Sequence, residues 1–401
     1  MSAPVRPMGT PRVLGESLSN RNNSLNLLRL ILASIVVLSN AAGLAGFNRW
    51  VGLVNGTSAA QIALFGFFAI SGYLIAQSAM RSKPLRYLWK RFLRIFPGLL
   101  ICLLVTAFGF GIIAWYASGP RSCGLSCYFG APDSPFLYVA KNILLANPFM
   151  VQHTIAGTPT GYFAAWNASI WTLFYEFACY VLLVILAAIG ILRRRTVALL
   201  LFLALWASVI LITVTPSLAV HFNRYAYISI AAMLRFSVVF LAGSILYLYR
   251  DRVPDSPWLA LGSAGLYATG VLWPIFTTGH EPTLDFTPID IGSPFIVYPI
   301  LWLGIHLPGR GIGAKNDLSY GIYIYGWPIA ELLLIWNANR LGVATFEILA
   351  LAATIPLAAL SWWLVERPSL RLKSLSLHRT AETASDAPAI VTQDADPGAG
   401  G

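Results

Sequence analysis

Apolar stretches long enough to cross a lipid bilayer recur along nearly the whole chain, and they constrain the fold more than any other feature. Crossing about 30 Å of hydrocarbon takes roughly 20 mainly apolar residues in a helix. Hydrophobic residues make up 57% of the 401 residues and charged residues only 11%, which is more apolar surface than a soluble domain of this length needs. Because backbone polar groups in lipid must be satisfied within the segment, the sequence predicts an all-α integral membrane protein.

We expect a bundle of about ten transmembrane helices. The apolar stretches lie at 25–45, 61–79, 95–117, 168–191, 196–214, 229–249, 257–276, 290–306, 318–337 and 343–364. Polar sequence precedes the first stretch and no small-residue cleavage pattern follows it, so it is not predicted to be a cleaved signal peptide. The loops between most stretches are short, which indicates one membrane domain over 25–374 without a detachable soluble module.

Positive charges are distributed unevenly between the two sides of this predicted bundle. With the N-terminus inside, 20 of the 27 Lys and Arg residues fall in inner loops and ends, and 5 fall in outer loops. Because Lys and Arg accumulate on the cytoplasmic side of membrane proteins, both termini are predicted to be cytoplasmic. The net charge of +11 then needs no nucleic-acid partner, since this topology and contact with anionic membrane lipid account for it.

Three segments stand apart from the predicted helices. Residues 1–24 form a cytoplasmic N-terminal segment. Residues 118–165 form a long external loop rich in Gly, Pro, Ser and aromatic residues, a composition and length that favour an ordered lid. Residues 375–401 contain too few apolar side chains to fold, so a disordered cytoplasmic tail is expected there.

The four cysteines predict no metal centre. Cys123 and Cys127 lie in the external loop, where an oxidising compartment permits a local disulfide, and two free thiols fit the sequence equally well. Cys102 and Cys179 fall within apolar spans, where we expect them to pack as small apolar side chains. No Cys/His spacing resembles a metal site, so no metal cofactor is expected.

Ionisable residues inside the spans are candidates for function, because they are costly to place in a bilayer. Arg29 and Asn40 are eleven residues apart, which places them on one side of a helix about 16 Å from each other. Either they mark the two ends of a polar track, or Arg29 reaches the inner interface while Asn40 bonds a neighbouring helix. Glu176 needs a partner or water. Arg235 is a candidate partner, in a pair that is either structural or catalytic.

Seven short motifs follow one another in order from about residue 22 to 373. They are Arg29 with the position eleven residues later, Phe68-x-x-Ser71-Gly72, Arg91-x-x-Arg94, Ser169-Ile-Trp171-Thr-Leu-x-x-Glu176, Arg235-Phe with Phe240-Leu-Ala-Gly243, Ser319-Tyr-Gly-Ile-Tyr-Ile-Tyr325 and Val365-Glu366-Arg367-Pro368. Each motif alone is weak, whereas the whole series in register is specific. Together they make the chain resemble the membrane acyltransferase-three family.

This resemblance implies a membrane-bound O-acyltransferase of the bacterial inner membrane, one that transfers groups other than aminoacyl groups. It implies acetyl-coenzyme A as the acyl donor on the cytoplasmic side. The implied acceptor is a hydroxyl of an extracytoplasmic carbohydrate or other envelope molecule. Acyl-coenzyme A, the acceptor and membrane lipid are therefore the expected partners.

The resemblance also implies a donor site. Arg91 and Arg94 are neighbours on one helical face. A guanidinium pair of this kind can hold the phosphates of coenzyme A through charge-assisted bonds, or it can anchor the helix to lipid headgroups. Ser71 and Gly72 are expected to let their helix approach a ligand or a neighbouring helix closely.

Aromatic residues are the candidates for binding the acceptor. Trp171, Tyr320 and Tyr323 are assigned to this role. An aromatic ring at the outer interface can stack on a sugar, and a membrane-interface belt accounts for such residues nearly as well.

Asn40 departs from the family pattern. The resemblance implies a His at this position, acting as the base that deprotonates the acceptor hydroxyl. An amide cannot take up a proton near neutral pH and can only form hydrogen bonds, and loss of a general base typically lowers the rate by about 10² to 10⁴. Gly326 replaces a second His that many relatives carry, which is a milder change.

Three interpretations of this substitution remain open. An active acyltransferase takes its base from Glu176, or from His153 in the external loop. A noncatalytic or impaired relative, or a chain altered at position 40, still binds the donor or a glycan. A transporter also accommodates Arg and Glu within its spans, although the inverted pairs of Gly- or Pro-broken helices typical of that class are absent from the sequence.

Overall fold

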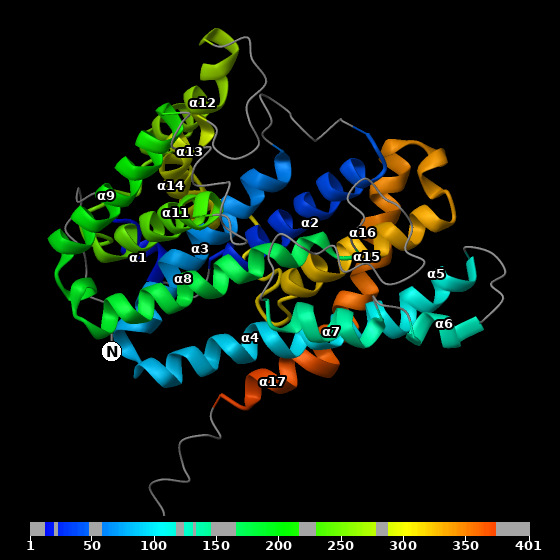
Figure 1. Cartoon of the computed structure of the whole chain (residues 1–401). Coiled ribbons are helices and arrows are strands. Elements are labelled where there is room, and N and C mark those ends of the chain that lie inside the picture. The colour runs from blue at the N-terminus through cyan, green and yellow to red at the C-terminus, as the bar shows by residue number, and fades with distance from the viewer. Residues whose placement is uncertain are drawn as a thin grey trace, which may run out of the picture.

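The computed structural model describes residues 13–19, 23–47, 58–117, 124–130, 134–145, 166–215, 230–277 and 288–373, and over these ranges it is helical without a β-strand (Figure 1). The longer helices are α2 (Leu25–Leu44), α3 (Ala59–Arg81), α4 (Pro84–Val105), α8 (Trp171–Ala188), α9 (Arg195–Val214), α11 (Ile230–Leu248), α12 (Pro257–Thr277), α15 (Ser319–Ile335) and α16 (Val343–Ser361). The shorter helices are α1 (Leu14–Ser19), α5 (Gly111–Ala117), α6 (Gly124–Gly130), α7 (Pro135–Ile143), α13 (Pro288–Gly292), α14 (Val297–His306) and α17 (Arg367–Arg371). The all-α prediction is confirmed for the described residues.

Seven helical segments in these ranges are long and apolar enough to cross a membrane. They are Leu25–Leu44, Ala59–Arg81, Pro84–Ala117, Ala168–Ala188, Arg195–Val214, Ile230–Leu248 and Val343–Arg371. The other three predicted spans correspond to α12, to α13 and α14 with a 3₁₀ turn between them, and to α15, which has 17 residues. The structure therefore supports a multi-pass membrane protein, with seven rather than ten clear spans.

The third membrane segment begins earlier than the apolar pattern predicts. α4 starts at Pro84 and continues through a π-helical turn, Thr106–Phe110, into α5. Proline is favourable at the first position of a helix, because it lacks the N–H that would have no partner there. The basic residues between 84 and 94 therefore lie on the same helix as the apolar span, and Arg91 and Arg94 are held in its first half.

Segments that the charge pattern predicts on the inner side contact one another. The N-terminal α1 packs on the turn after α11, where the backbone N–H of Leu14 donates to the carbonyl of Val253 at 2.8 Å. On the same side, Arg195 pairs with Asp251 at 3.0 Å. These contacts place the starts of α1 and α9 and the end of α11 at one end of the bundle, as a common inner face requires.

The centre of the bundle is formed by α2, α3, α11 and α15 (Figure 1). The closest helix crossing joins α3 to α11 through two glycines. A Cβ atom at Gly72 would lie 2.0 Å from the carbonyl oxygen of Phe240, and one at Gly243 would lie 2.4 Å from that of Ala69. The Ser244 hydroxyl also donates to the Gly72 carbonyl at 3.1 Å. Small residues allow this backbone approach, which is a principal source of helix association in lipid.

Replacing Gly72 by Ala should strongly destabilise the protein. The new methyl group would meet backbone atoms of Phe240, which cannot rotate away, so we expect a cost at or above the upper part of the range of about 1–3 kcal/mol for overpacking. Thermal unfolding of the purified protein in detergent measures this effect. Gly262→Ala in α12 is the matched control, because its added Cβ would meet nothing within 4 Å outside the neighbouring backbone of its own helix. An equal melting temperature for the two variants would contradict the tight crossing.

Two short helices, α6 and α7, are described within the predicted external loop of 118–165. Tyr128 and Tyr138 from these helices are buried, and the Tyr128 hydroxyl donates to the carbonyl of Ala107 in the π-helical turn. The described parts of this segment are thus packed against the end of the α4–α5 helix. The remaining residues of the segment, including His153, lie outside the described ranges, as do 1–12 and the predicted tail of 375–401.

The cysteines follow the expected division between loop and span. Cys127 is disulfide-bonded, and Cys123 lies outside the described residues. Cys102 and Cys179 are buried free thiols. The prediction that these two pack within the spans is confirmed, and the Cys102 thiol also donates to the carbonyl of Ile324 at 3.3 Å.

Candidate functional site

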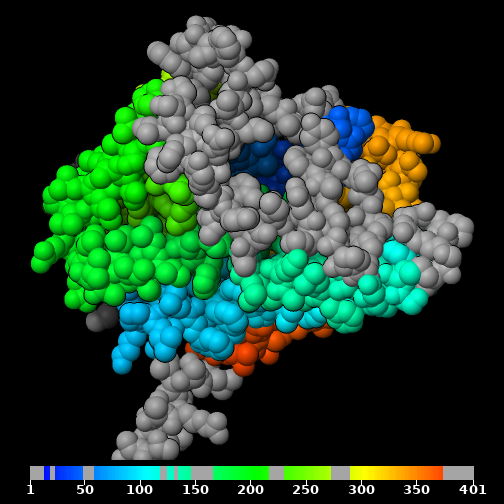
Figure 2. Space-filling view, viewed as in Figure 1, coloured from blue at the N-terminus to red at the C-terminus, as the bar shows by residue number. Residues whose placement is uncertain are grey.

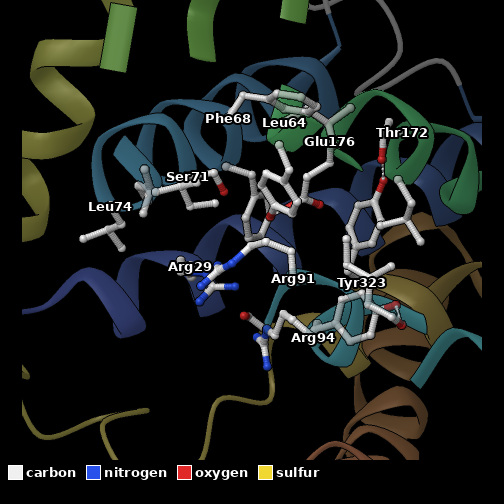
Figure 3. Close-up of a pocket in the computed structure, with 18 residues that line it drawn as sticks. Arg29, Leu64, Phe68, Ser71, Leu74, Arg91, Arg94, Thr172, Glu176 and Tyr323 are labelled. Carbon is white, nitrogen blue, oxygen red and sulfur yellow. Dashed lines mark hydrogen bonds between the residues drawn. The ribbon is translucent and has the colours of Figure 1, made fainter. Parts of the chain in front are cut away.

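A cavity of about 100 Å³ lies between α2, α3, α4, α8 and α15 (Figure 3). Seven of the ten predicted site residues line it: Arg29, Ser71, Arg91, Arg94, Glu176, Tyr320 and Tyr323. They come from five helices, so only the folded bundle brings them together. The other three, Asn40, Gly72 and Trp171, are not among the lining residues, and Gly72 belongs to the α3–α11 crossing. The space-filling view shows α4 and α8 adjoining one another on the surface beside this region (Figure 2).

Asp317, just before α15, is the residue that organises the cationic side of this cavity. Its Oδ2 accepts from Arg29 at 2.8 Å and from Arg94 at 2.6 Å, and its Oδ1 accepts from the Ser319 hydroxyl at 2.5 Å. Burial raises the pKa of Asp317, but the two guanidinium groups and the Ser319 bonds outweigh burial and hold that pKa below its usual range. Asp317 is therefore an ionised bridge between α2 and α4.

Sequence reasoning missed Asp317. The signal that could have found it is the presence of Arg29 and Arg94, because two buried cations in a membrane protein require counter-ions. Asp317 stands immediately before a predicted span that starts at 318, and a carboxylate there also suits the positive end of a helix dipole.

Arg94 has a second carboxylate partner. Its guanidinium lies 3.5 Å from Glu366, which also accepts from the Ser361 hydroxyl at 3.2 Å. The Arg94 guanidinium carbon is 5.6 Å from the centre of the Tyr320 ring. With two anions and an aromatic face around it, Arg94 is largely neutralised by the protein itself.

Arg91 differs from Arg94 in having no carboxylate partner among the described residues. Its guanidinium carbon lies 5.9 Å and 5.8 Å from the ring centres of Tyr87 and Tyr180, and its buried Nε has no hydrogen-bond partner. Cation–π contacts of this kind orient a guanidinium without neutralising it. Arg91 therefore presents positive charge to the cavity, where an anionic ligand can bind it.

Lys373, which follows α17, adds to the positive charge beside this arginine. The pKa of the Lys373 ammonium is lowered to about 8, first by burial and then by repulsion from Arg91, Arg94 and Lys90. Cations that repel one another at a partly buried site are stabilised when an anion binds between them. The arrangement suits a phosphate-bearing ligand.

Glu176 faces the same cavity from α8 (Figure 3). Its Oε1 accepts a hydrogen bond from the Tyr180 hydroxyl, one turn further along the helix.

The predicted pairing of Glu176 with Arg235 is wrong. Arg235 instead binds Asp290, with Nε–Oδ1 at 2.6 Å and Nη2–Oδ2 at 2.9 Å, because α13 places a buried carboxylate beside α11 that the linear sequence does not reveal.

Asn40 is linked to the cavity through a series of hydrogen-bonding groups. Its Nδ2 donates to the Ser169 hydroxyl at 3.3 Å, and the Ser169 carbonyl accepts from the Tyr323 hydroxyl at 2.6 Å. Tyr323 lines the cavity and also bonds Thr172. Asn40 therefore bonds a neighbouring segment, the 3₁₀ turn Ala168–Ile170 before α8. This is the second of the two sequence interpretations, and the hydrogen bonds that start at Asn40 reach Tyr323, whereas Arg29 bonds Asp317. Trp171 packs instead on aromatic rings of α8 and α11.

No group of His, Cys, Asp and Glu suited to a metal ion occurs within the described ranges. The polar groups that line the cavity are guanidinium, carboxylate and hydroxyl groups. Such a set can bind an anion, hold a polar substrate and move a proton.

Comparison with known proteins gives a match to one family model and to two proteins of known sequence. A family model described as an acyltransferase domain matches residues 22–363. An O-acetyl transferase of Shigella phage Sf6 is 28% identical over 373 residues, covering 89% of this chain and 99% of the relative. Nodulation protein 10 of Rhizobium leguminosarum bv. viciae is 28% identical over 395 residues, covering 92% and 99%. No solved structure shows a significant match.

The family match begins just before α2 and ends within the π-helical turn before α17. It therefore includes every helix that lines the cavity. The same stretch contains the seven segments able to cross a membrane, apart from the last residues of the seventh. The chain thus belongs to the acyltransferase domain family and is a multi-pass membrane acyltransferase.

Proposed function

We propose that this protein transfers an acyl group, most simply acetyl, from cytoplasmic acyl-coenzyme A to a hydroxyl of an extracytoplasmic glycan or other envelope molecule. The observation that carries the proposal is a cavity between membrane helices whose lining includes both Glu176 and the guanidinium of Arg91, which has no carboxylate partner among the described residues. The name of the phage relative, O-acetyl transferase, supports acetyl as the group and oxygen as the acceptor. We place the protein in the bacterial inner membrane with both termini in the cytoplasm.

The donor end of the site is assigned to Arg91, with Ser71 on the facing wall. Arg91 lies in the first half of α4, the half nearer to the predicted inner segments. A guanidinium with free donors binds phosphate through short, charge-assisted hydrogen bonds. Arg94 and Arg29 support this site indirectly, because Asp317 already occupies their donors and fixes their positions.

The acceptor end is assigned to the track of Tyr323, Ser169 and Asn40. In the reaction, the acceptor hydroxyl oxygen forms a bond to the thioester carbonyl carbon while a base takes its proton. The carbon–sulfur bond then breaks, and coenzyme A leaves with its sulfur protonated. Asn40 cannot be that base. Glu176 is the carboxylate that lines the cavity, so we assign the proton to it.

Arg91→Ala should weaken binding of acetyl-coenzyme A by roughly tenfold or more, since a hydrogen bond to a charged group contributes about 1.5–3 kcal/mol and each 1.4 kcal/mol is tenfold in affinity. Titration calorimetry of the purified protein with acetyl-coenzyme A measures this. Arg86→Ala is the matched control, because Arg86 is exposed on the same helix and does not line the cavity.

Release of coenzyme A in the presence of acetyl-coenzyme A and envelope glycan tests the reaction itself. Release that depends on the glycan supports the proposal. Unchanged donor binding in a correctly folded Arg91→Ala variant would assign Arg91 to lipid anchoring instead. Movement of a solute across vesicles without any acyl donor would favour a transporter.

A further inference from the structure

A second cavity, of about 320 Å³, lies at the end of the helices that bound the first. It is bounded by the end of α3, the connection to α4, the end of α8 and the turn that follows it. Its lining residues are mostly apolar or small, among them Met80, Pro84, Val184, Ala187 and Leu192, and they include Arg193. None of these residues lines the first cavity, so the second is a separate feature of the fold.

The two cavities follow one another along the same three helices. On α4, Pro84 of the second cavity is seven residues before Arg91 of the first, which is about 10 Å along the helix axis. On α8, Tyr180 of the first cavity is one turn before Val184 of the second, about 6 Å along the axis. A single elongated molecule lying against α3, α4 and α8 would therefore reach both cavities and would pass Arg91 in the first.

The walls of the second cavity combine apolar surface with positive charge. Met80, Val184 and Leu192 offer apolar contact to a flat ring, and Arg193 supplies the cation. Gly190 has a φ of +81° in the turn that ends α8, a conformation that favours glycine, and this turn brings Arg193 to the cavity. A heterocycle that carries phosphate matches these walls.

We propose that the second cavity binds the adenosine 3′-phosphate end of coenzyme A. The diphosphate then lies at Arg91, and the acyl-bearing pantetheine arm enters the first cavity toward Glu176 and Tyr323. This inference rests on the proposed use of an acyl-coenzyme A donor. It explains why a separate apolar cavity with its own arginine lies outside the acyl site, and it makes the nucleotide a determinant of donor specificity.

Two donors that differ only in the nucleotide test this assignment. Arg193→Ala should raise the KM for acetyl-coenzyme A by about fivefold to tenfold, the effect of losing one hydrogen bond to a charged group at an exposed arginine. The KM for S-acetyl-4′-phosphopantetheine, which lacks the adenosine, should stay unchanged. Ala187→Trp, which fills the cavity, should act in the same direction. Arg194→Ala is the matched control, because Arg194 is the exposed arginine next to Arg193 and does not line the cavity.

Binding without turnover provides the second measurement. Adenosine 3′,5′-bisphosphate should bind the native protein, compete with acetyl-coenzyme A, and lose most of its affinity in Arg193→Ala. An equal rise in KM for both donors, or no competition by the nucleotide, would overturn the inference. Competition by phosphatidylglycerol micelles in place of the nucleotide would overturn it as well, and would assign the cavity to a lipid headgroup. If the protein binds the nucleotide through Arg193 but releases no coenzyme A, the assignment of the second cavity holds and the proposed reaction is contradicted.

Discussion

Asp317→Asn should destabilise the folded protein by about 3 kcal/mol or more. The substitution keeps the size of the side chain but leaves Arg29 without a counter-ion and Arg94 with Glu366 alone. Removing one partner from a buried ion pair is costly because the remaining charge stays out of water, and the Asp317 and Arg94 side chains are only 17% and 14% exposed. Thermal unfolding in detergent measures the loss, and donor affinity should fall with it.

Asp251→Asn is the matched control for this experiment. Asp251 pairs with Arg195 at 3.0 Å, but the Arg195 and Asp251 side chains are 39% and 54% exposed, respectively. An exposed pair of this kind contributes less than about 1 kcal/mol. Equal losses of stability in the two variants would show that Asp317 is not the bridge between α2 and α4.

The same carboxylate predicts a pH dependence. Because the folded-state pKa of Asp317 is lowered, its contribution to stability is fully present above the ordinary Asp value of about 4. That contribution decreases as the pH falls from there toward the lowered pKa of the folded state. Asp317→Asn should remove this part of the acid sensitivity, so its unfolding temperature should change less than that of the native protein over this interval.

Asn40→His should raise acetyl transfer by at least about tenfold, the lower part of what a positioned general base supplies. Asn40 already bonds the Ser169 hydroxyl at 3.3 Å, so an imidazole at this position has a group to orient it. Binding of acetyl-coenzyme A should barely change, because Arg91 is untouched and Asn40 does not line the donor cavity. Release of free coenzyme A from purified protein with envelope glycan measures the rate.

Two further variants identify the base of the native enzyme. Glu176→Gln should abolish turnover if the carboxylate in the cavity takes the proton, and His153→Ala tests the external segment. Robust native activity that Asn40→His leaves unchanged would contradict a missing base at position 40. A native protein that binds donor without turnover, and that Asn40→His activates, would identify this chain as an impaired relative.

The apolar pattern by itself determined that the chain is helical and crosses a membrane several times, because bilayer thickness fixes the length of a spanning segment. It also determined much of the site. Motifs on separate spans predicted Arg29, Arg91, Glu176 and Tyr323, and the structure places all four around one cavity. The pattern could not place the start of α4, since charge at 84–94 hides a helix that extends beyond its apolar part.

Only the tertiary structure decided which of the charged residues are free. Asp317 is 288 residues from Arg29 and 223 from Arg94 in the chain, so no local spacing reveals the bridge that neutralises them. Arg235 likewise binds Asp290 instead of the Glu176 that its position in a span had suggested. Charged side chains in a bundle pair with those that are close in space. The distance between two side chains depends on how the helices pack, through contacts such as that of Gly72 with Phe240. Arg91 is available to a ligand because this packing gives its neighbours, and not Arg91, the carboxylates.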